Sequence, residues 1–167
     1  MRTLKIKIKY INKELPKIES IAKGDWIDLR SAIELCATFP EVINGKVFFQ
    51  SCEIPLNVCM QLPKYYEANI VPRSSTFKNF GMILCNSFGV IDNTYCGDGD
   101  QWYFGAIFLK ECKINQGDRI AQFRINLSQK APWYIKLKWL FTSKIKFLEV
   151  ETLENENRGG MGSSGRE

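Results

Sequence analysis

Residues 85–102, CNSFGVIDNTYCGDGDQW, decide how the rest of this chain is interpreted. The stretch is apolar or aromatic at both ends, and the turn-forming triplet Asp92-Asn93-Thr94 lies between two runs that can pair as strands. We therefore expect a β-hairpin whose open edge offers backbone N–H and C=O groups to the Watson–Crick edge of a base. Asp92 and Tyr95 lie at the bend, where their side chains can point into a pocket. Alone, this stretch predicts a nucleotide-binding hairpin and nothing more.

Composition predicts one globular domain. The chain has 167 residues, 45% of them hydrophobic and 25% charged, which is enough to bury a core and too apolar for wholesale disorder. The formal charge is +5 without a long basic run. Such a surface suits small polyanions as well as nucleic acid, so charge does not decide between them.

The cysteines and the N-terminus indicate a cytoplasmic protein. Six cysteines are scattered without a CxxC pair and there is no histidine, which argues against zinc and favours free thiols in a reducing compartment. Residues 4–10 alternate apolar and lysine side chains, which predicts a half-buried strand rather than a signal peptide. No apolar window is long enough to span a membrane.

Several further short apolar runs, such as residues 48–60 and 65–71, are separated by turn residues. This pattern predicts an all-β sandwich or barrel. Residues 30–39 could form a helical turn or two. A shorter helix is expected over TFKNFG, residues 76–81.

Three polar motifs have both a simple and a functional interpretation. Asp28, in GDWIDLRSA, can be a turn cap. Arg73, Ser74 and Ser75 place guanidinium and hydroxyl donors together, which suits a phosphate, yet a serine there can also be a helix N-cap. Gln122 follows the Gly-Asp turn of GDRIAQF on an alternating strand, where a glutamine is usually a surface residue.

Two segments near the C-terminus are unusual in composition. Residues 128–146 are basic and aromatic, and their alternation of lysine with apolar residues predicts a β-hairpin rather than an amphipathic helix. Residues 154–167 are polar and rich in glycine and serine, which predicts a flexible arm. Their GGMGSSG run also resembles a loop that wraps phosphates, although it lacks the GK[ST] of a Walker loop.

Together, five stretches resemble the five motifs of trimeric dUTP pyrophosphatases (dUTPases), in order and with roughly the right spacing. They are GDWIDLRSA, PRSS, NSFGVIDNTYCG, GDRIAQF and RGGMGSSG. Within this family, the chain resembles in particular the members from Gram-positive bacteria and their phages. It implies an all-β, jelly-roll-like (β-clip) protomer over residues 1–153, a flexible C-terminal arm, and a homotrimer with active sites shared between subunits. It also implies Mg²⁺-dependent hydrolysis of dUTP to dUMP and pyrophosphate, without nucleic-acid or membrane partners.

The resemblance assigns roles to the nucleoside part of the site. Asp92 orients the attacking water and Tyr95 packs under the deoxyribose, which leaves no room for a 2′-hydroxyl. Asn86 and the backbone of Gly89 and Ile91 read uracil.

It also implies a phosphate part of the site. Arg73, Ser74, Ser75 and Gln122 bind phosphates and place the water, and Asp28 reaches Mg²⁺ through water. The arm closes over the γ-phosphate from a neighbouring subunit through residues that include Arg158, Ser163 and Ser164.

The chain departs from the family pattern in three ways. Arg158 directly precedes the Gly-Gly pair, whereas two residues usually intervene. Met161 replaces the aromatic residue that stacks on uracil, so Trp102 or Tyr103 is a candidate lid. Residues 128–146 lengthen the chain, and this insert is either a structural hairpin or a contact for a protein partner such as a repressor.

Other functions remain open at this stage. A dCTP deaminase shares the fold but requires its own motif in place of GVIDxxY. A regulatory interaction protein would use the nucleotide pocket as a switch and the insert as its contact surface. A single-strand-binding module is favoured only by the lysines and aromatic residues of WYIKLKW.

Overall fold

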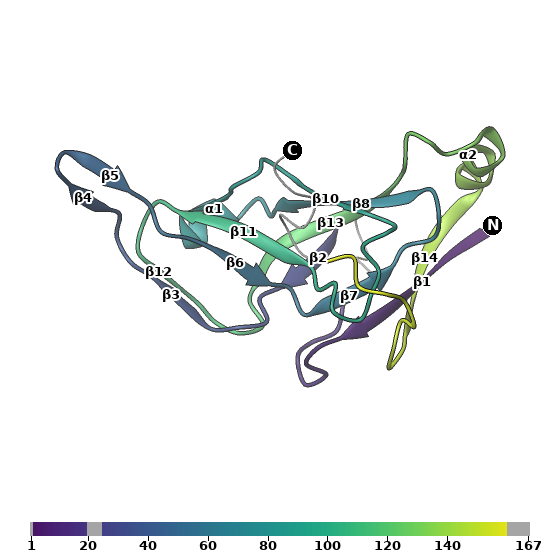
Figure 1. Cartoon of the computed structure of the whole chain (residues 1–167), viewed down its shortest axis with the longest axis horizontal. Coiled ribbons are helices and arrows are strands. Elements are labelled where there is room, and N and C mark those ends of the chain that lie inside the picture. The colour runs from purple at the N-terminus through teal and green to yellow at the C-terminus, as the bar shows by residue number, and fades with distance from the viewer. Residues whose placement is uncertain (1, 20–24, 160–167) are drawn as a thin grey trace.

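Short strands make up most of the chain (Figure 1). The computed structural model describes residues 2–19 and 25–159. Among these residues, strands form three small sheets and two isolated pairs, which confirms the predicted all-β class. None of the helices in this part of the chain has the length and apolar content needed to cross a membrane.

The first sheet has the order β14-β1-β7 and joins the two ends of the chain. Its strands are β1 (Arg2–Tyr10), β7 (Val58–Gln61) and β14 (Thr142–Glu149). The predicted alternation in β1 is confirmed, because Leu4, Ile6, Ile8 and Tyr10 are buried and the lysines between them are more exposed. β14 pairs with β1 in parallel.

The second sheet has the order β10-β8-β13-β2. Its strands are β2 (Ile27–Arg30), β8 (Tyr66–Pro72), β10 (Gly89–Asp92) and β13 (Arg119–Leu127). Because β13 pairs with both β2 and β8, three distant parts of the sequence meet on this sheet. β10 lies at its edge.

The remaining elements extend the molecule along its long axis. The third sheet contains β6 (Ser51–Pro55), β11 (Tyr103–Phe108) and β9 (Met82–Leu84). The isolated pairs are β3 (Leu35–Ala37) with β12 (Cys112–Ile114), and β4 (Glu41–Ile43) with β5 (Lys46–Phe48). The β4–β5 hairpin projects at one end of Figure 1, and helix α2 (Trp133–Leu140) lies at the other. Helix α1 (Thr76–Phe80) forms where it was predicted.

Aromatic side chains occupy the centre of the core. Trp102, Phe104, Phe108 and Phe123 are fully buried, and the rings of Trp102 and Phe123 meet edge to face with centroids 5.2 Å apart. Such pairs contribute beyond the area that they bury. Gly105 of β11 allows a close approach of its neighbour, since a Cβ at this position would lie 2.5 Å from the sulfur of Cys85.

The predicted hairpin over residues 85–102 is wrong in its pairing. β10 pairs with β8 and not with the residues that follow it, and residues 93–102 form turns. The physical reason lies in the GDGD run. The carboxylate of Asp100 accepts the N–H of Gly97 at 2.8 Å, so this backbone group is satisfied by a side chain instead of a partner strand.

The helical turn predicted over residues 30–39 is also wrong. The chain leaves β2 at Arg30 and forms β3, which pairs with β12. Between the two strands, the N–H of Ser31 donates to the carbonyl of Asp118, and the carbonyl of Ser31 accepts from the N–H of Gly117. Because these backbone groups bond to another loop, they are not available to a helix.

The insert at residues 128–146 is a helix followed by a strand, and not the predicted hairpin. Pro132 is the N-cap of α2, and β14 begins at Thr142. Ile135 and Trp139, four residues apart, both pack against the core, and Trp139 meets the ring of Tyr66 at 5.5 Å. Residues four apart share one face of a helix, so a helix lets both side chains pack against the core. This packing outweighs the alternation of lysines, which favours a strand.

Trp102 tests the aromatic core. Replacing Trp102 with Ala should lower the free energy of unfolding by about 3–5 kcal/mol, because a fully buried ring is lost and a cavity remains. Denaturant titration followed by circular dichroism measures the change. The neighbouring Tyr103→Ala variant is the control and should cost far less, since Tyr103 is 36% exposed. Equal losses would contradict this description of the core.

Candidate active site

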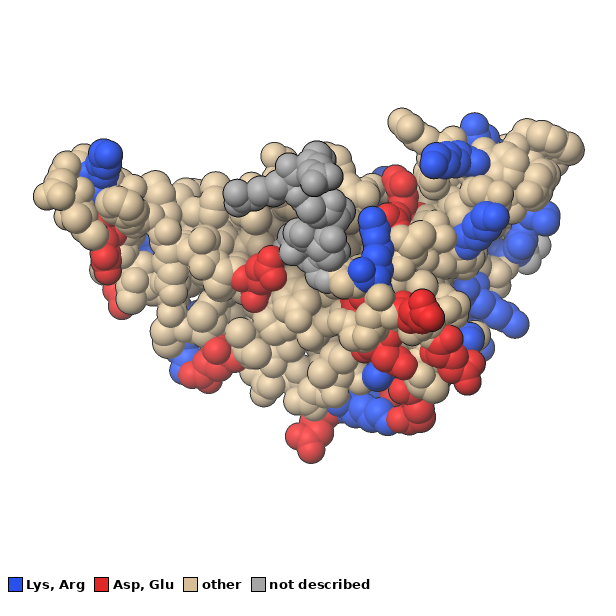
Figure 2. Space-filling view, viewed as in Figure 1, with Lys and Arg blue, Asp and Glu red and all other residues tan. Residues whose placement is uncertain are grey.

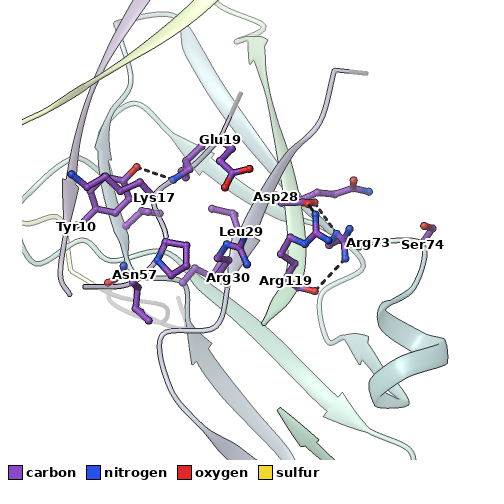
Figure 3. A pocket seen from close by; sticks show the side chains of 16 residues that line it. Tyr10, Lys17, Glu19, Asp28, Leu29, Arg30, Asn57, Arg73, Ser74 and Arg119 are labelled. Carbon is purple, nitrogen blue, oxygen red and sulfur yellow. Dashed lines mark hydrogen bonds and ion pairs between the residues drawn. The ribbon is translucent and has the colours of Figure 1, made fainter. Parts of the chain in front are cut away.

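Three strands of the second sheet bring polar side chains together at one end of β8. Gln122 on β13 lies in register with Asp28 on β2 and with Val71 on β8. Arg73 follows β8 directly, so its guanidinium reaches the same place (Figure 3). The Gln122 amide donates to the carbonyl of Pro72 at 3.2 Å. The structure therefore unites Asp28, Arg73 and Gln122, which the sequence analysis had selected separately.

Asp28 is held between two arginines. Its carboxylate accepts a hydrogen bond from Nε of Arg73 at 2.7 Å and another from Nη1 of Arg119 at 3.1 Å. We call Asp28, Arg73 and Arg119 the guanidinium cluster. Arg119 was not among the residues predicted from the sequence, although its position three residues before Gln122 in GDRIAQF is a signal for it. Each guanidinium has donors left over that suit phosphate oxygens.

The guanidinium cluster borders a cavity of about 540 Å³. Ser74 and residues 15–19 also line this cavity. Its lining contains four cationic side chains, Lys17, Arg30, Arg73 and Arg119, against two acidic ones, Glu19 and Asp28. The excess of positive charge suits a polyanion. Ser75 is the N-cap of α1 without a side-chain cap, and its hydroxyl lies 3.4 Å from Nη1 of Arg73.

Asp92 and Tyr95 lie at the other end of β8. Oδ1 of Asp92 accepts hydrogen bonds from the N–H and hydroxyl of Thr94, at 2.7 and 2.5 Å, and Oδ2 accepts from Arg158 at 2.5 Å. Desolvation by burial opposes ionisation, but these donors outweigh it and lower the pKa of Asp92. Asp92 is therefore an ionised acceptor at neutral pH.

The ring of Tyr95 is fixed by its hydroxyl, which donates to the carbonyl of Gln101 at 2.8 Å. Burial raises the pKa of Tyr95 to about 12, with a further contribution from the charge of Asp100. Tyr95 is consequently a neutral, partly buried phenol whose ring can pack against a ligand, and it is not an acid–base group near neutral pH.

The residues selected for reading a base lie on or beside β10. Gly89 and Ile91 are on this strand, and Asn86 is exposed in the turn before it. Within the described sheet β10 pairs only with β8, so its other edge offers N–H and C=O groups to a ligand. This edge supplies what the predicted hairpin was expected to supply.

The candidate lid residues differ in their accessibility. Trp102 is 0% exposed and packs on Phe123, so the prediction that it covers a bound base is wrong. Tyr103 is 36% exposed and remains available. Met161, Ser163 and Ser164 lie outside the described residues.

The two groups of site residues are not adjacent in one chain. Asp92 pairs with Glu67 at the start of β8, whereas Arg73 follows its end. At about 3.3 Å per residue, the six residues from Glu67 to Arg73 separate the two groups by about 20 Å. A single chain therefore has the guanidinium cluster and the Asp92–Tyr95 site at opposite ends of one strand.

A charged cavity at one end of β8 and an open strand edge at the other place the protein in the class of all-β nucleotide-binding proteins. Comparison with known proteins gives the family. The dUTPase family model matches residues 33–132. The chain is 44% identical to the SPbeta prophage-derived deoxyuridine 5'-triphosphate nucleotidohydrolase of Bacillus subtilis, covering 97% of this chain and 99% of that protein. It is 32% identical to the deoxyuridine 5'-triphosphate nucleotidohydrolase of Neorickettsia sennetsu, covering 92% and 89%.

Solved structures agree on the fold. The dUTPase of Streptococcus mutans superposes with a TM-score of 0.61 at 16% identity, covering 75% of this chain and 98% of that one. The dUTPase from phage phi11 of S. aureus gives a TM-score of 0.61 at 15% identity, covering 76% and 92%. The chain belongs to the dUTPase family, as its five motifs had indicated.

The environment of Asp92 predicts a specific response to pH. Thr94→Val removes one of the hydrogen bonds that lower the pKa of Asp92, so this pKa should rise toward its ordinary value. Because the folded pKa is depressed, Asp92 stabilises the fold above its unfolded pKa, and this contribution disappears as the pH falls through the folded pKa. NMR titration of the Asp92 carboxyl carbon measures the shift.

Thr142→Val is the matched control for this titration. The hydroxyl of Thr142 donates to the carbonyl of Lys138 and does not contact Asp92. It should leave the pKa of Asp92 unchanged. An unaltered pKa in Thr94→Val would show that the Thr94 hydroxyl does not stabilise the carboxylate.

Proposed function

We propose that Asp92 orients the water with which this dUTPase-family enzyme hydrolyses dUTP to dUMP and pyrophosphate. The observation that carries the proposal is an ionised carboxylate, held by Thr94 and Arg158, at the end of an open strand edge. A carboxylate has about four acceptor positions, so it can accept from a water while it keeps these bonds. The water then attacks the α-phosphate in line with the departing pyrophosphate. Such an activity keeps uracil out of DNA and supplies dUMP for thymidylate synthesis.

The nucleoside part of the site supports selection of deoxyuridine. The free edge of β10 at Gly89 and Ile91, with Asn86, pairs with the polar edge of uracil, and the exchanged donor and acceptor pattern of cytosine mismatches it. The ring of Tyr95 packs under the sugar and excludes a 2′-hydroxyl. Tyr103 is the remaining aromatic candidate to cover the base.

The phosphate part of the site uses the guanidinium cluster. Arg73 and Gln122 neutralise charge that develops on the phosphate oxygens and help to place the water. Ser74 and Ser75 add hydroxyl donors beside Arg73. Arg119 belongs to the same set because it shares Asp28 with Arg73. From the C-terminal arm, Met161, Ser163 and Ser164 complete the enclosure of the substrate, whereas Arg158 holds Asp92 of its own chain instead of closing over a neighbouring subunit.

Mg²⁺ fits this site as a partner of the substrate. Among the residues that the structure describes, no group of three or more His, Cys, Asp or Glu side chains could hold a metal ion, and the one carboxylate in the guanidinium cluster is already paired. Mg²⁺ keeps several waters and takes direct ligands from substrate phosphates. Asp28 would contact such an ion through water, and the ion would neutralise phosphate charge.

The spacing along β8 supports sites that are shared between copies of the chain, and the family resemblance implies that the assembly is a homotrimer. One substrate must contact both Asp92 and Arg73, which lie about 20 Å apart in one chain by the rise of β8. If a neighbouring copy supplies one of the two groups, the separation within a chain is no obstacle. Closed cyclic assemblies repeat such a contact at every interface.

The cytoplasm is the compartment that suits this enzyme, because its six free thiols remain reduced there.

A second candidate function is binding of a protein partner, for example a repressor, through the insert at residues 128–146. Helix α2 partly buries Ile135 and Trp139 but leaves Trp133 and Leu140 75% and 78% exposed. Exposed aromatic and aliphatic residues that are grouped together are typical of interface cores. Lysines beside them add positive charge at the same end of the molecule (Figure 2). Partner binding is compatible with catalysis.

Asp92→Asn tests the catalytic proposal. The wild type should release pyrophosphate from dUTP in the presence of Mg²⁺ and should discriminate strongly against dCTP, dTTP and UTP. The variant, which keeps the shape but loses the charge, should lose activity by at least about 10²-fold. Ammonia release from dCTP would instead support a deaminase, and a fully active variant would rule out the role of Asp92.

Subunit mixing tests the shared site. Arg73→Ala and Asp92→Asn proteins should each be nearly inactive alone. Refolding them together should restore activity in roughly a quarter of the sites, since each site then draws the two groups from different copies. If the mixture stays as inactive as its components, each site is built within one chain.

A further inference from the structure

A C-terminal segment, residues 152–159, lies against the loop at residues 96–100. At its start, Asp98 accepts hydrogen bonds from the hydroxyl of Thr152 at 2.5 Å and the N–H of Leu153 at 2.9 Å. Further along, the side-chain oxygen of Asn157 accepts from the N–H of Gly99 at 2.7 Å. This part of the predicted arm is therefore attached to the domain directly beside the Asp92 turn.

Asp100 holds the far end of the segment. It is 1% exposed, and its carboxylate accepts from the N–H groups of Gly97, Arg158 and Gly159 at 2.8, 3.0 and 3.3 Å. The last two are consecutive, and Gly159 has a positive φ of 91°, so they form an anion-binding concavity. Burial of a carboxylate is costly unless it is hydrogen-bonded, so these three bonds offset the cost of burying Asp100.

The loop is shaped to receive this segment. A Cβ on Gly97 would lie 2.6 Å from Cα and 2.8 Å from the backbone nitrogen of Asn157. Backbone cannot move away as a flexible side chain can, so a larger residue at position 97 would displace the segment. Gly97 and Asp100 thus contact neighbouring parts of the same segment, Gly97 at Asn157 and Asp100 at Arg158 and Gly159.

The contact with Asp100 also affects Asp92, because Arg158 bonds to both residues. With the N–H groups of Arg158 and Gly159 both fixed on Asp100, the Arg158 side chain starts from a defined position. Its guanidinium donates to Oδ2 of Asp92 at 2.5 Å. Asp100, Arg158 and Asp92 thus form a chain of charge-assisted contacts from the core to the site.

We propose that Asp100 is a positioning residue for the dUTPase reaction. It holds the backbone of Arg158 and Gly159 and thereby aims the Arg158 guanidinium at Asp92. The inference rests on the proposed function of Asp92. No sequence motif singled out Asp100, and its role follows from the three N–H groups that converge on it.

Asp100→Asn tests this role, since the amide keeps the volume but replaces one acceptor oxygen with a donor that faces N–H groups. We expect kcat/KM for dUTP to fall about 10- to 100-fold, as for a displaced catalytic contact. Because Arg158 no longer stabilises the ionised Asp92, the acid limb of the kcat/KM pH profile should move to higher pH. A merely structural residue would lower the rate without moving this limb.

Matched variants make the test specific. Arg158→Gln should move the acid limb in the same direction, and the Asp100→Asn/Arg158→Gln double variant should move it no further, because both act on one contact. Glu151→Gln, at an exposed ion pair with Lys13, should match the wild type. An unmoved acid limb in Asp100→Asn, or additive effects in the double variant, would overturn the proposal.

Gly97→Ala and hydrogen exchange test the contact between Asp100 and the C-terminal segment in two further ways. If Asp100→Asn does not fold, Gly97→Ala displaces the same segment and should give the same pH shift. Hydrogen exchange of the Arg158 and Gly159 amides should be slow in the wild type and fast in either variant, and fast exchange in the wild type would overturn the proposal. A wild type without dUTP turnover would contradict the proposed function itself, whereas an active wild type with an unmoved acid limb would refute only the role of Asp100.

Discussion

The length of strand β8 is the constraint on which the rest of this structure depends. β8 pairs with β10 on one side and β13 on the other, so it carries the Asp92–Tyr95 site at one end and the guanidinium cluster at the other. The rise of a strand is fixed by its backbone, and no side-chain movement closes the distance. The Asp92–Tyr95 site and the guanidinium cluster of one chain therefore stay apart.

Paired charges organise each half of the site. Asp28 lies between two guanidinium groups, and Asp92 contacts Arg158. These pairs are partly exposed, so their contribution to stability is modest. Their value is geometric, because each carboxylate orients donors that also suit phosphate oxygens.

Several local features follow from the sequence because they depend on nearby residues. The lysine alternation of β1 predicts its buried face, and the short helix α1 forms over the residues expected. The five motifs indicated the family because chemistry constrains residue type at each of them. The resemblance placed Arg73, Gln122 and Asp28 in one phosphate site, and the fold brings the three residues together.

Long-range contacts decided what the sequence analysis missed. The pairing of β10 with β8 replaced the local hairpin, and packing of Trp139 on Tyr66 made a helix of the insert. Asp100 and Trp102 lie two residues apart, and the sequence does not show their different roles. Asp100 holds the C-terminal segment, whereas Trp102 is part of the core.

The sequence by itself determined the family and the all-β class, because these depend on residue type and local periodicity. Only the tertiary structure decided that Asp92 and Arg73 lie at opposite ends of β8, and that Arg158 reaches Asp92 from a segment held by Asp100. Such placements arise from pairing and burial between residues far apart in the chain. No local pattern encodes them, since the partner of each group is chosen by the whole fold.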